Sequence, residues 1–185
     1  MRQRRIWLIL ALLLVAIGLP IGWYLLSPLF IERVVSEELP PALKEAMAPA
    51  MKEAAAKQKA MAEPMSGPAK PALVARGEFM PVAHEGRGRA LVYRAGTGEL
   101  LLRFEEFYVL NGPDLRVYMV RAPVVKSRAD VRDYIELGKL KGNRGDQNYP
   151  LPPGFDLTAY RSVVIWCHPF GVAFASASLA PVTGS

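Results

Sequence analysis

The cysteine and histidine content of this 185-residue chain is small, and it limits the chemistry that the side chains can perform. The sequence holds one cysteine, Cys167, and two histidines, His84 and His168. A thiol close to a histidine has a lowered pKa and acts as a nucleophile or a metal ligand. Zinc needs three or four such ligands, and these three residues are the whole supply. We expect no metal site, and Cys167 is the leading candidate for a chemical role.

The strand expected around the cysteine decides which histidine can meet the thiol. Successive side chains of a strand point to opposite faces, so Cys167 shares a face with Val163 and Ile165, and His168 belongs to the other face. That leaves His84, which lies in a glycine-punctuated stretch, as the candidate partner. The apolar neighbours indicate that the sulfur faces the core or a pocket leading into it. A buried, inert thiol is the alternative, because free cysteine packs like a small hydrophobic residue.

Two other groups of residues suggest metal binding, each with a plainer interpretation. Methionines at positions 47, 51, 61 and 65 form two pairs at spacing four, which on a helix would offer thioethers to Cu(I). A stripe of methionines that packs on a neighbour explains them better. The loop of residues 142–150 holds Asn143, Asp146 and Asn148, whose oxygens are calcium ligands by type. The loop lacks the closing acid of a calcium site, so turn hydrogen bonds are the favoured explanation.

The N-terminal region predicts a membrane anchor. Residues 6–26 carry no charge, and 21 residues at about 1.5 Å each span roughly 30 Å, the thickness of a bilayer core. Arg2, Arg4 and Arg5 precede this segment, so we expect a cytoplasmic N-terminus, residues 1–26 as a single-pass anchor of the cell membrane, and an extracytoplasmic remainder. A cleaved signal peptide is the alternative, but the segment is long and offers no small-x-small cleavage site.

The region after the anchor divides into a stalk and a domain. Residues 27–72 are rich in Ala, Lys, Glu and Pro, and we expect a stalk with helix within residues 42–62. Residues 73–185 are long enough for one core. The net charge of +6 includes the three N-terminal arginines, and the rest is spread over the whole domain, so no nucleic-acid partner is expected.

The pattern of residues 73–185 is mostly β. Apolar and polar residues alternate over short runs separated by Gly, Pro, Asn and Asp, which predicts an antiparallel β-sandwich or barrel-like domain with one helical turn near residues 129–137. The alternation changes phase at Glu105 and Glu106, which predicts a β-bulge. The expected strands cover residues 90–94, 99–110, 115–121, 162–167 and 171–179.

Three sequence blocks resemble the DM-thirteen domain family. They are NGPDLRVYM (residues 111–119), LGKLKGNRGDQNYPLP (137–152) and SVVIWCHPFGVAFASASL (162–179). The resemblance runs from about Gly77 to Leu179, and it implies a β-sandwich domain of an extracellular electron-transfer system that is often attached to membranes. It also implies a redox protein as partner, and Cys167 as a bare thiol or as a ligand to a prosthetic group such as haem.

A non-catalytic binding module is the alternative function. The chain has no complete catalytic set, with neither a nucleophile-elbow serine nor a Cys-x-x-Cys pair. Such a module would hold a protein or glycan partner at the cell surface. Tyr93, Tyr108 and Tyr118, if exposed, would form its contact face.

Overall fold

The computed structural model describes residues 2–27, 31–41, 43–44 and 71–182. Within these residues one helix, α1 (Arg2–Leu26), is long and apolar enough to cross a membrane, and its side chains pack on no other part of the chain. No charged residue follows Arg5 in α1, and the apolar side chains whose burial is described are exposed, which is unfavourable in water and suits contact with lipid. The four stalk methionines, and nearly all of the helix expected over residues 42–62, lie outside the described residues.

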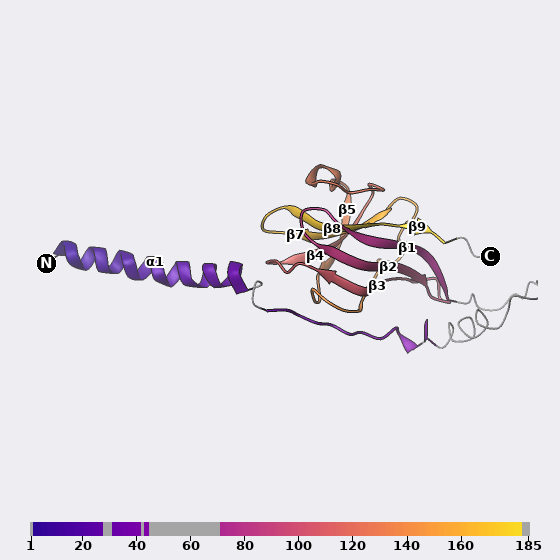
Figure 1. The fold of residues 1–185 in the computed structure, drawn as a ribbon, viewed down its shortest axis with the longest axis horizontal. Coiled ribbons are helices and arrows are strands. Elements are labelled where there is room, and N and C mark those ends of the chain that lie inside the picture. The colour runs from indigo at the N-terminus through magenta and orange to yellow at the C-terminus, as the bar shows by residue number, and fades with distance from the viewer. Residues whose placement is uncertain (1, 28–30, 42, 45–70, 183–185) are drawn as a thin grey trace, which may run out of the picture.

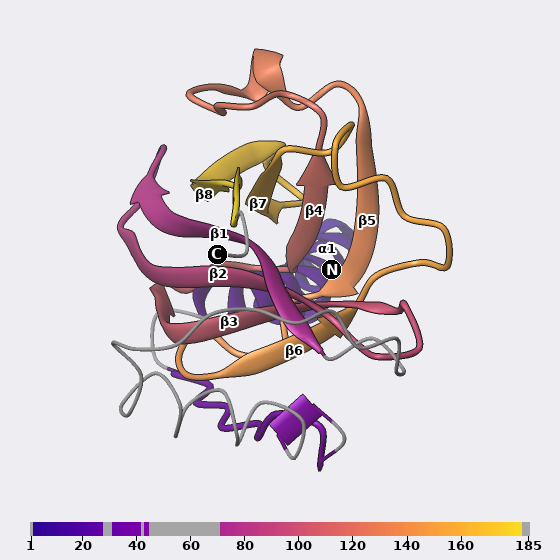
Figure 2. The same cartoon turned by 90° about the vertical axis from the view of Figure 1, so that its right-hand side faces the viewer.

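The domain is a nearly closed, barrel-like antiparallel sheet, as expected from the sequence (Figures 1 and 2). Neighbouring strands follow the order β5-β4-β7-β8-β1-β2-β3-β6, and a short β9 pairs with β1. The strands are β1 (Ala72–Pro81), β2 (Gly86–Arg94), β3 (Leu100–Val109), β4 (Leu115–Val120), β5 (Tyr134–Lys139), β6 (Gln147–Pro150), β7 (Ser162–Cys167), β8 (Val172–Ser178) and β9 (Ala180–Pro181).

The core lies inside the curved sheet and is built on aromatic rings. Phe79 meets the rings of Phe104 and Phe107 edge to face, with both centroid distances at 4.9 Å. Residues of alternate parity on β7, including Val163 and Ile165, complete this core. The central strands β4, β7 and β8 are buried on both faces, because residues of the opposite parity, including Tyr118 and Val164, pack in a second cluster.

The bulge predicted in β3 is present. The ladder between β2 and β3 passes from the Arg87–Tyr108 pair to the Arg89–Glu105 pair, so β3 contributes one residue more than β2. Glu106 takes up the extra length with a positive φ of 51°. This conformation explains how the alternation changes phase without breaking the strand.

The structure corrects the expected elements in three places. A 3-10 helix forms at Arg128–Asp130, within the region expected to turn, but β5 then occupies residues 134–139. The strands β1 and β6 were not expected at all. The strands β1 and β5 are exposed along much of their length, and β6 is only four residues long with a buried glutamine, so their sequences lack the apolar alternation that marks a half-buried strand.

The chain that follows α1 lies against the domain. Residues 31–41, called the post-helix segment below, run beside the residues that lead into β6 (Figure 1). The amide of Val35 donates to the carbonyl of Arg144 at 2.9 Å, and the amide of Glu37 donates to that of Asp146 at 2.9 Å. This part of the expected stalk therefore adds parallel pairing to the edge of the sheet.

Candidate functional site

The thiol of Cys167 is sealed inside the domain at the end of β7. The residue pairs with Leu115 at the start of β4, and its side chain has no solvent exposure. Its Sγ donates a hydrogen bond to the carbonyl oxygen of Pro113 at 3.2 Å. The sulfur belongs to the same core cluster as Val163 and Ile165, so the strand face expected from the sequence is confirmed.

The turn of residues 111–114 covers the sulfur. The side-chain oxygen of Asn111 accepts from the amide of Gly112 at 3.0 Å, which tightens the turn. A Cβ at Gly112 would lie 2.8 Å from the Phe174 ring, so glycine allows the turn to sit directly on the core. Asp114 closes the turn with a φ of 47°, a conformation that aspartate tolerates better than most residues.

The carboxylate of Asp114 is the main charge near the thiol. Arg116 donates to its Oδ2 at 2.8 Å, and this hydrogen bond lowers the pKa of Asp114. Its Oδ1 is buried and accepts no hydrogen bond from any described residue. The ammonium group of Lys139 lies with Nζ at 3.6 Å from Oδ1, and the imidazole of His168 lies with Nδ1 at 3.9 Å from Oδ2. The sequence marked Asp114 only as a turn residue and did not reveal this role.

The surroundings of Cys167 keep its thiol protonated. Burial raises the pKa of Cys167, and a hydrogen bond from the amide of Phe170 to the sulfur opposes this effect only in part. The negative charge of Asp114 raises the pKa further. The site therefore holds a neutral S–H group and not an activated thiolate.

Both histidines lie at the same end of the barrel as Cys167, but neither bonds to the thiol among the described residues. His168 directly follows β7, and its side chain is half exposed beside Asp114. The ring of His84 contacts the ring of Phe174 at an interplanar angle of 53°, with the centroids 4.0 Å apart. His84 is thus placed by an aromatic contact, and its role toward Cys167 stays a prediction.

The arrangement around the sulfur does not fit a haem. An iron ligand needs a free lone pair that points into an open apolar space, whereas this sulfur has no exposure and hydrogen-bonds to Pro113. Its strand neighbour Leu115 and the ring of Phe174 belong to the same packed cluster. Cys167 as placed here offers a bare thiol.

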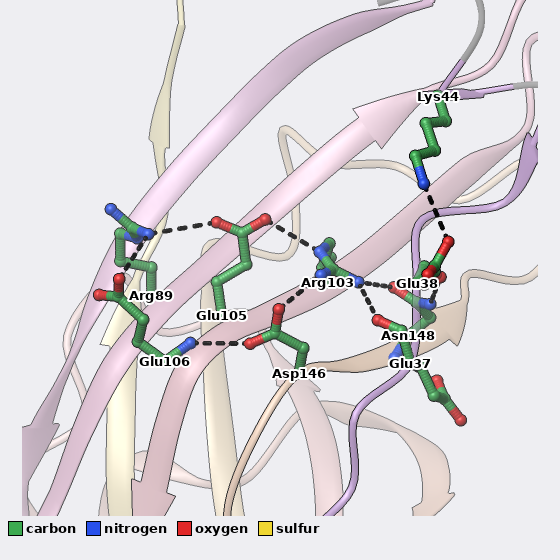
Figure 3. A network of polar contacts seen from close by, with 9 residues as sticks. All are labelled: Glu37, Glu38, Lys44, Arg89, Arg103, Glu105, Glu106, Asp146 and Asn148. Atoms are coloured by element: carbon green, nitrogen blue, oxygen red, sulfur yellow. Dashed lines mark hydrogen bonds and ion pairs between the residues drawn. The ribbon is translucent and has the colours of Figure 1, made fainter.

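A second polar cluster, missed in the sequence, fastens the post-helix segment to the domain (Figure 3). Arg103 is only 5% exposed, and its guanidinium donates to the carboxylates of Glu105 at 2.9 Å and Asp146 at 2.7 Å. It also donates to the side chain of Asn148 at 3.0 Å and to the carbonyl of Glu37 at 2.9 Å. We call these five residues the Arg103 network. The one signal of this network in the sequence is an arginine that follows three leucines in β3.

The Arg103 network accounts for the loop that resembled a calcium site. The side chain of Asp146 accepts from Arg103 and from the amide of Glu106. The side chain of Asn143 is buried and accepts from the amide of Arg33 at 2.7 Å. These oxygens are therefore engaged by protein donors that lie far away in the chain, and not by the local turn hydrogen bonds expected from the sequence.

The tyrosines expected in a contact face are mostly inside the molecule. Tyr93 is 5% exposed and Tyr118 is 2% exposed. Tyr108 is half-buried, with the guanidinium groups of Arg87 and Arg144 over its ring at 4.3 and 4.9 Å. The three residues do not form a common exposed surface.

Replacing Asp114 with asparagine should remove part of the acid sensitivity of the domain. The pKa of Asp114 is lowered in the folded chain, so its stabilising effect is present above the ordinary carboxyl pKa and is lost as the pH falls below it. Asparagine keeps the turn but loses the charge-assisted bond from Arg116, which should cost about 1 to 2 kcal/mol at pH 7. Urea unfolding from pH 3 to 7 measures both effects. Asp133→Asn, at an exposed position, is the control, and equal acid curves for wild type and Asp114→Asn would contradict the prediction.

The fold and the site define a class of protein: a barrel-like β domain behind one apolar helix, with a single thiol buried beneath an end turn. A family model described as "Electron transfer DM13" matches residues 78–179, more than half of the chain. The chain belongs to the electron transfer DM13 family, and the resemblance found in the three sequence blocks is confirmed. No curated protein and no solved structure matches the chain.

Proposed function

We propose that this chain is a membrane-tethered electron-transfer domain whose redox group is the thiol of Cys167. In this proposal α1 remains in the cell membrane with its N-terminus in the cytoplasm, and the barrel works on the extracytoplasmic side. One observation carries the role of the thiol: a chain of an electron-transfer family has a single cysteine, and that cysteine is buried under one turn of the barrel. With no second cysteine in the sequence, an intramolecular disulfide cannot be its purpose.

The chemistry assigned to the site is the loss of one electron and one proton from the S–H group. A one-electron oxidant, carried by a partner redox protein, takes the electron, and the S–H bond breaks. The S–H group donates to the Pro113 carbonyl in the resting state, so the thiol turns toward the carboxylate of Asp114 to release its proton, which passes by way of the half-exposed imidazole of His168 to the solvent. A one-electron donor reverses the step. Burial suits this role because it excludes the water and oxygen that would otherwise consume an oxidised sulfur.

Voltammetry of the full chain in lipid nanodiscs tests the proposal. We expect a one-electron signal whose midpoint potential falls by about 59 mV per pH unit, since one proton leaves with each electron. The signal should vanish in Cys167→Ser, and in Asp114→Asn it should keep its pH dependence but show slower electron transfer, since a proton relay changes the rate and not the equilibrium. Circular dichroism checks that each variant is folded.

Two outcomes would overturn the role of the thiol. The first is a signal that persists in folded Cys167→Ser, and the second is a wild-type chain with no signal. A visible absorption band in the protein as isolated, retained in Cys167→Ser, would assign the electron to a bound group instead. Full function in a cellular assay of Cys167→Ser would favour a non-catalytic binding module.

A further inference from the structure

One end of the barrel gathers the candidate residues. The turn after β1 (residues 82–85), the turn at 110–114, the loop at 140–146 and the β7–β8 turn (168–171) all lie there, and we call them the cysteine end. Backbone hydrogen bonds join these turns to one another. They run from Leu110 to Glu85 at 2.9 Å and from His168 to Asp114 at 3.1 Å.

The polypeptide enters the domain at the cysteine end. The amide of Ile31 donates to the carbonyl of Ser27 at 3.1 Å, and Ser27 directly follows α1. The side chain of Asn111 in turn donates to the carbonyl of Ile31. Ile31 therefore joins the C-terminal end of the helix to the turn that covers the thiol.

The next residues attach the chain to the domain beyond Ile31. The amide of Arg33 is held by Asn143 at the cysteine end, and Glu37 is held by the Arg103 network farther along the sheet. The ammonium group of Lys141 adds an ion pair to the carboxylate of Glu37 at 2.7 Å. The post-helix segment thus has attachments at both ends, so it fixes which end of the barrel faces the helix.

The surface of the cysteine end suits a layer of lipid headgroups. Phe170 at the tip of the β7–β8 turn is 57% exposed, and Leu110 and Ile31 also expose their apolar side chains. Among them stand the basic side chains of Lys139 and Arg144, which are themselves largely exposed. Apolar and aromatic side chains next to basic ones are the composition of surfaces that rest in a membrane interface.

We propose that the cysteine end rests on the headgroup layer of the bilayer that α1 spans, with Phe170 and Leu110 entering the boundary of the acyl chains. The inference depends on the anchor role proposed above. It places Cys167 one turn of chain away from the lipid surface. The redox partner then reaches the thiol along the membrane and not from the open medium.

A fluorescence depth measurement on the full chain tests this orientation. In a Cys167→Ala background, Phe170→Cys carries a fluorophore at the cysteine end, and Thr97→Cys carries it in the β2–β3 turn at the opposite end. The chain is reconstituted in phosphatidylcholine vesicles that contain lipids with a spin label on the headgroup. We expect the label at position 170 to lose most of its fluorescence and the label at position 97 to keep it. Should the alanine background not fold, Cys167→Ser replaces it.

The outcomes separate the orientation from the anchor. Extraction of the chain by an alkaline carbonate wash would overturn the anchor, and with it the basis of this inference. If the chain stays in the vesicles and both labels are quenched equally, or neither is quenched, the orientation is wrong while the anchor stands. Strong quenching at position 170 alone supports both.

Discussion

Replacing Arg103 with methionine should lower the free energy of unfolding by about 2 to 4 kcal/mol, because it removes the buried cation that joins two partly exposed carboxylates to the post-helix segment. Methionine keeps most of the volume of the side chain, so the loss is one of hydrogen bonds and charge. The groups that lose a hydrogen bond from Arg103 are the carboxylates of Glu105 and Asp146 and the carbonyl of Glu37. Urea unfolding of the purified chain measures the effect.

Arg89 provides a matched control for this substitution. Its guanidinium pairs with the same carboxylate of Glu105, at 3.3 Å, but its side chain is 47% exposed. Exposed ion pairs contribute little, so Arg89→Met should change stability by less than about 1 kcal/mol. Similar losses for the two variants would show that burial of Arg103 is not the source of its effect.

Alanine at position 145 should release the post-helix segment from the sheet. A Cβ on Gly145 would lie 1.9 Å from the carbonyl oxygen of Val35, and the residue has a φ of +93° that alanine adopts only under strain. Backbone strain of this kind costs roughly 1 to 3 kcal/mol, and the clash adds the loss of the pairing between Val35 and Arg144. Hydrogen exchange should accelerate at the amides of Val35 and Glu37 before it does so elsewhere in the barrel.

Gly98→Ala measures the cost of backbone strain without a steric clash. Gly98 has a φ of +90°, and no atom lies within 4 Å of the place where its Cβ would stand. This variant should show only the cost of strain, with unchanged exchange at Val35. If both variants lose the same stability and leave the post-helix segment protected, the contact between Gly145 and Val35 does not hold the segment.

The parts that sequence patterns predicted are those determined by local alternation. The face of Cys167 follows from the parity of its strand, and the bulge at Glu106 follows from a change of phase between neighbours. The turn at residues 111–114 was likewise recognisable from its residue types. Each of these features depends on residues only a few positions apart.

The missed parts depend on contacts between residues far apart in the chain. The guanidinium of Arg103 meets Asp146 across 43 positions and Glu37 across 66, and no local pattern records such a meeting. Arg116, two positions away, forms an ion pair with the carboxylate of Asp114. The burial of this carboxylate comes from β7 and the turn packed against β7. The strand β6 was missed because it is a short strand at the sheet edge, and β1 was missed although it lies between β8 and β2, because its sequence carries little apolar alternation.

The pairing of the post-helix segment also determines the order in which the chain can fold. Arg33 bonds to Asn143 across 110 positions, and Glu37 bonds to the amide of Asn148 across 111. During synthesis the post-helix segment therefore emerges long before the residues that receive it, and contacts of such sequence separation form late. The nascent chain carries an unpaired edge beside its helix until β6 has been made. Attachment of the post-helix segment therefore cannot precede the synthesis of β6, whereas β7, β8 and β9 are added to the barrel later still.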